Sequence, residues 1–97
     1  MSFGKKIVLH TPMGYVPSLD DLVEQFIRDG VQFVAVVGQD CSRVEDIIDE
    51  LVVGDGSDDG RYICTSSHAD GTLEAAIEFA RLLTGEYAGD VEVVELA

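Results

Sequence analysis

Three apolar runs in this chain each end at a short polar cluster, and an amphipathic helical pattern follows each cluster. The clusters are His10-Thr11-Pro12, Gly38 to Ser42, and Thr65 to His68. A strand-length run followed by a helix is the repeating unit of a parallel α/β sheet. In such folds these clusters gather at the carboxyl edge of the sheet, where ligands usually bind. The repeat therefore predicts the fold class and the place of a site, without naming a ligand.

The spacing of apolar residues predicts four strands and three helices. Strands are expected at residues 5–10, 31–37, 61–66 and 91–96. Helices are expected from Ser18 to Gly30, from Ser42 to Gly54, and from Asp70 or Thr72 to Gly85. Ser18, Ser42 and either Asp70 or Thr72 are the expected N-caps, and Ser42 with Glu45 has the capping-box pattern.

These elements predict one α/β domain over residues 1–97. Short connections and right-handed crossovers favour a small three-layer, flavodoxin-like or Rossmann-like sandwich with mainly parallel strands in the order 2-1-3-4. In this order the first helix covers one face of the sheet, and the second and third helices cover the other. The last strand lies at an edge, where Glu92 and Glu95 would discourage pairing with other chains.

The third helix has a wider apolar arc than one buried face requires. Ala75, Phe79 and Leu82 adjoin its inner stripe, which leaves only a narrow polar side. We therefore expect these three residues to form an interface, either in a homodimer or with another protein.

The charge balance limits the expected partners. Nineteen acidic residues against six Lys and Arg give a formal net charge of −13. This charge repels nucleic acid and anionic membranes, and it fits either a salty cytoplasm or a basic protein partner. The sequence shows no secretory leader or membrane span, so a cytoplasmic protein is expected. Its length suffices for a core without a cofactor or metal, and its two cysteines are expected to be reduced.

The strand-end clusters supply the candidate ligand-binding residues. These are His10, Gln39, Asp40, Cys41, Ser66, Ser67 and His68. Two histidines, a thiol and a carboxylate are ligand types that Zn²⁺ prefers, but none of them has the spacing of a local ligand pair. Cys41 at a helix start suggests a nucleophile with a histidine as its base, although the acidic surroundings disfavour a thiolate. Backbone amides at the helix starts suggest a small-molecule or anion site instead.

The segment Asp55 to Gly60 begins like a calcium-binding loop, with oxygen ligands at alternate positions before a glycine. The twelfth position is Ser66 where a bidentate glutamate is needed, so a solvated acidic turn is the preferred interpretation.

The sequence contains no complete catalytic signature, phosphate loop or dinucleotide fingerprint. The first expectation is therefore a non-catalytic protein-association module or accessory subunit. The alternative is a small-ligand- or metal-binding enzyme whose site lies at the carboxyl ends of the first three strands.

Overall fold

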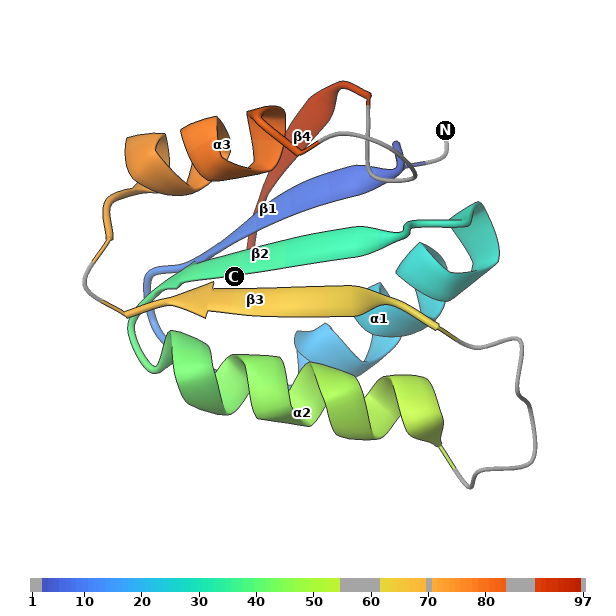
Figure 1. Ribbon diagram of the computed structural model, residues 1–97. Helices are drawn as coiled ribbons and strands as arrows, with labels where there is room; N and C mark the ends of the chain where they lie inside the picture. The colour runs from blue at the N-terminus through green and yellow to red at the C-terminus, as the bar shows by residue number, and fades with distance from the viewer. Residues whose placement is uncertain (1–2, 55–61, 70, 84–88, 97) are drawn as a thin grey trace.

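The computed structural model describes residues 3–54, 62–69, 71–83 and 89–96 (Figure 1). Strands and helices alternate along the chain, as the sequence predicted. The elements are β1 (Lys6–Thr11), α1 (Ser18–Asp29), β2 (Phe33–Gly38), α2 (Cys41–Val53), β3 (Cys64–His68), α3 (Leu73–Arg81) and β4 (Val91–Glu95). The predicted α/β fold class is therefore confirmed.

All four strands are parallel, and they lie in the order β3-β2-β1-β4. The predicted order 2-1-3-4 is wrong, because it placed β2 at an edge of the sheet. Five of the six residues of β2 are buried, whereas every residue of β3 is only partly buried. The more apolar strand therefore takes the interior position, and the polar strand takes the edge.

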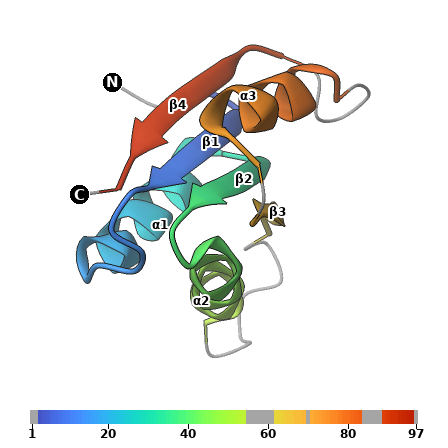
Figure 2. The ribbon, with the colours of Figure 1, turned by 90° about the vertical axis from the view of Figure 1, so that its left-hand side faces the viewer.

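The helices divide unequally between the two faces of the sheet (Figure 2). The chain moves in one direction across the sheet from β1 to β3, so right-handed crossovers place α1 and α2 on the same face. It then reverses to reach β4, which places α3 on the opposite face. The expectation that the first helix would cover a face alone is therefore wrong, and α3 is the helix that does so among the described elements.

The core has two parts, one on each face of the sheet. On the α1/α2 side, Ile7 and Val34 pack with Phe26 and Ile48. On the α3 side, side chains of the same strands pack against two helix alanines; the set is Val8, Phe33, Ala35, Val37, Ala76 and Ala80. The small Ala76 and Ala80 side chains allow α3 to approach the sheet closely.

The helix starts differ from two of the predicted caps. Helix α1 starts at Ser18 with Pro17 as its N-cap, and α2 starts at Cys41 with Asp40 as its N-cap. The predicted capping box of Ser42 and Glu45 is wrong because both residues lie inside α2. Helix α3 has the predicted cap: the backbone N–H of Ala75 donates to the Thr72 hydroxyl at 3.1 Å.

Lys6 lies beneath the carboxyl end of α3 and is 1% exposed. Its Nζ donates to the carbonyl oxygen of Ala80 at 2.6 Å. A cation at this position complements the partial negative charge of the helix end. None of the described helices is long and apolar enough to cross a lipid bilayer.

Candidate functional site

One row of residues crosses the carboxyl edge of the sheet. His10 of β1 lies opposite Val37 of β2 and Glu95 of β4, and Val37 lies opposite His68 of β3. Because paired strand residues point to the same face, all four side chains lie on the α3 side. His10 and His68 are therefore two strand spacings apart, about 10 Å between their Cα atoms.

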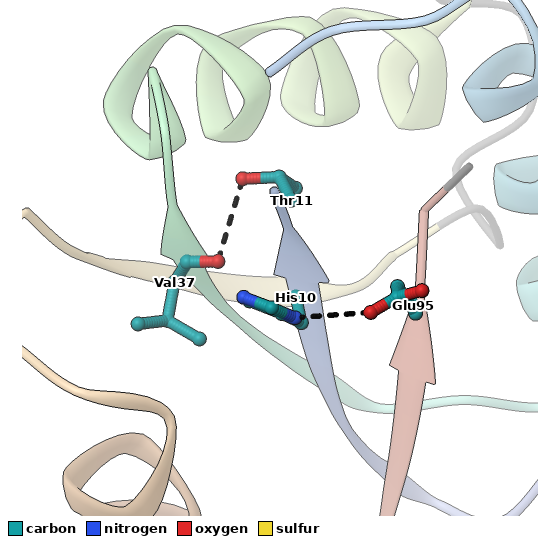
Figure 3. Close-up of polar contacts among 4 residues, drawn as sticks. All are labelled: His10, Thr11, Val37 and Glu95. Atoms are coloured by element: carbon teal, nitrogen blue, oxygen red, sulfur yellow. Dashed lines mark hydrogen bonds and ion pairs between the residues drawn. The ribbon is translucent and has the colours of Figure 1, made fainter. Parts of the chain in front are cut away.

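His10 contacts Glu95 within this row (Figure 3). The His10 Nδ1 lies 3.4 Å from the Glu95 Oε1, and the side chains are 30% and 63% exposed. This pair lies between β1 and β4, where the direction of the chain across the sheet reverses. That point is where parallel α/β sheets usually bind ligands.

Thr11 fixes the connection that follows β2. Its hydroxyl lies 3.0 Å from the Gln39 carbonyl oxygen and 3.4 Å from that of Val37, and the latter contact is drawn in Figure 3. The Gln39 N–H donates back to the Thr11 carbonyl oxygen at 2.9 Å. Gly38 has φ +124°, and a Cβ there would lie 2.7 Å from the Thr11 carbonyl oxygen. The carboxyl ends of β1 and β2 thus lie so close together that there is no room for a side chain at Gly38.

This junction places Gln39 and Asp40 at the surface and Cys41 in the core. Asp40 has φ +52°, a left-handed conformation that reverses the chain into α2. Cys41 is 1% exposed, so its side chain packs in the core. This burial gives no support to the suggested role of Cys41 as a nucleophile: the N-cap of α2 is Asp40, two residues before the predicted cap Ser42, so Cys41 lies inside the helix with its side chain turned inward. Cys64 is only partly buried and packs at the margin of the core on the α3 side.

A shallow cavity of about 400 Å³ lies at the start of α2. Its lining is formed by Gly38, Asp40, Cys41, Ser42, Arg43 and Ala69. The cavity thus joins the β2–α2 connection to the residue that follows β3. Of the predicted ligand-binding residues, Asp40 and Cys41 line it.

Ser66, Ser67 and His68 belong to β3, which ends two residues later than the sequence predicted. Ser66 and His68 share one face, and the Ser66 Oγ lies 3.0 Å from the His68 Nε2. Ser67 points to the opposite face, where its Oγ lies 3.4 Å from the Ser42 Oγ. The two serines therefore cannot serve one ligand on a single face of the sheet.

The predicted residues thus form separate groups. His10 pairs with Glu95, Asp40 and Cys41 line a cavity, and His68 pairs with Ser66. Within residues 3–54, 62–69, 71–83 and 89–96, no three His, Cys, Asp or Glu side chains lie close enough together to hold a metal ion. The proposed calcium loop from Asp55 to Gly60 lies outside the described residues.

The predicted interface residues on α3 face solvent. Phe79 is 41% exposed and Leu82 is 69% exposed, and Ala75 is exposed as well. The Phe79 ring lies edge-on to His68, with ring centroids 4.7 Å apart, and 6.1 Å from the Phe33 ring. Ala75 and Leu82 are four residues before and three residues after Phe79, so they share its side of the helix. The apolar arc therefore faces β3.

The sequence did not predict the neighbours of two glutamates, Glu95 and Glu45. Glu95 was assigned to edge protection alone, although the alternation of strand side chains could have placed it beside His10 once the strand order was known. Glu45 was assigned to a cap, but it lies beside Asp49 over β3. The Thr65 hydroxyl lies 2.9 Å from the Glu45 Oε2 and 2.7 Å from the Asp49 Oδ1.

Comparison with known proteins gives a family without an assigned activity. Neither the curated proteins nor the solved structures give a match to this chain. A family model described as a domain of unknown function (DUF7684) matches residues 8–96, which include all of the strands and helices except the first two residues of β1. The chain therefore belongs to the DUF7684 family.

Proposed function

We propose that this chain is a non-catalytic protein-association domain. Its contact surface combines the apolar arc of α3 with the adjoining face of β3. We call this region the α3–β3 surface; it consists of Cys64, Ser66, His68, Ala75, Phe79 and Leu82.

The observation that carries the proposal is the incomplete cover on the α3 side of the sheet. A helix is about 10 Å wide, and strands are about 4.8 Å apart, so one helix covers about two strands. Helix α3 packs mainly over β1 and β2. The outer face of β3 is left beside it, and Phe79 remains 41% exposed although its ring contacts Phe33 and His68. Exposed aromatic and aliphatic side chains around such a gap are typical of a contact surface.

The charge of the chain favours a different protein over a second copy. Each copy carries a formal net charge of −13, so two copies repel each other as they approach. A partner with a basic rim around an apolar contact is attracted by the same field. We therefore prefer a basic partner to the homodimer that the sequence suggested.

Site-specific photo-crosslinking tests this proposal. A photoreactive phenylalanine analogue placed at Phe79 or Leu82 should give one discrete adduct in host cells, identified by mass spectrometry. Met13 and Val53 are matched control positions, because they are 73% and 59% exposed and lie away from α3. Adducts of equal yield at all four positions, or none at Phe79 and Leu82, would contradict the proposal. Sedimentation velocity would separately reveal a homodimer.

A second candidate function is small-ligand binding at the His10–Glu95 pair. The observation that favours it is the position of this pair at the reversal point between β1 and β4. A separate cavity of about 320 Å³ lies on the α1 side of β4, the opposite face of the sheet from the His10 side chain; it is lined by Ser18, Asp21, Leu22, Gln25, Val94, Glu95 and Leu96. A fragment library screened by amide NMR should then shift the His10 and Leu96 signals, and Glu95→Gln should abolish those shifts. Shifts that map elsewhere would exclude this function.

A further inference from the structure

The two edges of the sheet differ in charge. Edge strand β4 carries Glu92 and Glu95 among its five residues. Edge strand β3 has the sequence Cys-Thr-Ser-Ser-His and carries no Asp, Glu, Lys, Arg or Pro. Charged side chains and proline are the usual means by which an edge strand avoids pairing with another chain. One edge is therefore protected in this way, and the β3 edge is not.

The backbone of β3 is oriented for pairing on its open side. The Cys64 N–H donates to the Gln32 carbonyl oxygen at 3.0 Å, which is the β2 side of the strand. Successive peptide groups of a strand point to alternate sides, so Ser66 and His68 also pair with β2. Thr65 and Ser67 then direct their N–H and C=O groups to the opposite side. Within the described part of the chain, β2 is the sole strand that pairs with β3.

The side chains beside this edge have a different chemistry on each face. On the α2 side, Glu45 and Asp49 approach the same Thr65 hydroxyl, at 2.9 and 2.7 Å. A hydroxyl has one hydrogen to donate, so one of the two carboxylates receives no hydrogen bond from Thr65 and can attract a cation on another chain. On the α3 side, the edge is bordered by the half-exposed ring of Phe79.

We propose that β3 accepts a fifth strand from a basic partner protein. The added segment pairs with the outward backbone groups of Thr65 and Ser67. Its alternate residues are Lys or Arg toward Glu45 and Asp49, and apolar toward Phe79. This inference rests on the proposed protein-association function and specifies the partner for the same surface.

A second copy of this chain fits the edge less well. Pairing β3 with another β3 would bring a second Glu45 and Asp49 to the same face of the sheet. Like charges on neighbouring strands are destabilising, and the net charges of −13 add to that repulsion.

Peptide binding to the full chain tests the inference. The probe is a peptide of about eight residues that alternates valine and lysine, compared with its valine–glutamate counterpart in about 0.15 M salt. We expect the lysine peptide to bind at least about tenfold more tightly, with amide NMR shifts concentrated at Thr65 and Ser67. A lysine peptide N-methylated at every residue keeps its charge but cannot donate backbone hydrogen bonds from either edge, and it should lose binding by at least about tenfold.

Two protein variants provide the matched comparison. Glu45→Lys with Asp49→Lys should reverse the preference, so that the glutamate peptide binds more tightly. Asp46→Lys with Glu50→Lys makes the same charge change on α2, but about 100° around the helix from the first pair, and should retain the lysine preference. If both double variants bind the glutamate peptide more tightly, the peptide preference depends only on the net charge of the protein, and the inference is wrong.

Ser67→Pro gives a further check, because it removes an N–H that faces the open edge and leaves the β2 pairing intact. It should abolish peptide binding while the Ser66 amide stays protected from exchange. Equal binding of the N-methylated and unmodified peptides would overturn strand addition whether or not this variant folds. Crosslinks at Phe79 and Leu82 with no edge binding would leave the association function standing and reject strand addition alone.

Discussion

Replacing Gly38 with alanine should be one of the most damaging small changes in this chain. The backbone at Gly38 has φ +124°, which L-residues rarely adopt and which costs about 1–3 kcal/mol for a residue with a side chain. The added Cβ would also lie 2.7 Å from the Thr11 carbonyl oxygen and 3.0 Å from the Thr11 N and C atoms. These are backbone atoms of a buried strand end, so they cannot move aside as a flexible side chain would.

Thr11 is held in place by the groups that surround Gly38. Its carbonyl oxygen accepts from the Gln39 N–H at 2.9 Å, and its hydroxyl lies 3.0 Å from the Gln39 carbonyl oxygen. Relief of the clash would therefore lengthen these contacts. Overpacking costs about 1–3 kcal/mol, so we expect Gly38→Ala to lower the free energy of unfolding by about 3–5 kcal/mol in total.

Gly30 supplies the control, because its φ is +78° but nothing lies within 4 Å of an added Cβ. Gly30→Ala should therefore cost only the backbone term, about 1 kcal/mol. Urea denaturation of both variants measures the difference, which should be at least about 2 kcal/mol, or roughly 10 °C in melting temperature. If Gly38→Ala is no less stable than Gly30→Ala, the close approach of β2 and β1 at this point is wrong.

Four further predictions follow from individual contacts. Thr72→Ala should lower the free energy of unfolding by about 1 kcal/mol through loss of the α3 cap, whereas Thr72→Ser should retain most of it in the same urea titration. Lys6→Ala should cost about 3 kcal/mol by the same measurement and Lys6→Met clearly less, because methionine keeps the buried stem and loses only the bond to Ala80; equal losses would contradict this. Ellman's reagent should modify Cys64 in the native state much faster than Cys41, and equal rates would show that Cys41 is accessible. Desolvation and then the hydrogen bond to Asp20, at 3.1 Å, raise the pKa of Tyr15, so Asp20→Asn should lower the Tyr15 pKa in an NMR titration while Asp21→Asn leaves it nearly unchanged.

Local patterns in the sequence were sufficient to predict the elements but not their neighbours. Each βα unit has an apolar run and a helical stripe that depend only on nearby residues, so all seven elements were expected. The strand order depends on which crossover connection reverses the direction of the chain across the sheet. No local sequence pattern predicts which connection this is. The apolar run Val31 to Val37 could have excluded an edge position for β2, and the polar Thr65 to His68 could have indicated one for β3.

The candidate site was predictable only in part for the same reason. His10 was correctly placed at a strand end, but its neighbour Glu95 is 85 positions away in the chain and became its neighbour only through the order β1-β4. The N-cap of α2 is Asp40 and not Ser42, and this shift of two residues placed Cys41 in the first helical turn with its side chain in the core. Prediction of which polar residues meet therefore requires the register as well as the fold class.

The position of two acidic residues beside β3 bears on why the chain is so acidic. Composition alone leaves two explanations for a net charge of −13, a salty cytoplasm and a basic partner. A salty environment favours acids spread over the surface, whereas partner recognition requires them beside a surface that can bind. Glu45 and Asp49 both lie at the Thr65 hydroxyl, beside the edge strand that has no charge of its own. Within the described part of the chain, β3 is the edge strand that has no charged side chain of its own. The two carboxylates lie beside this edge, and their position favours the basic partner as the explanation.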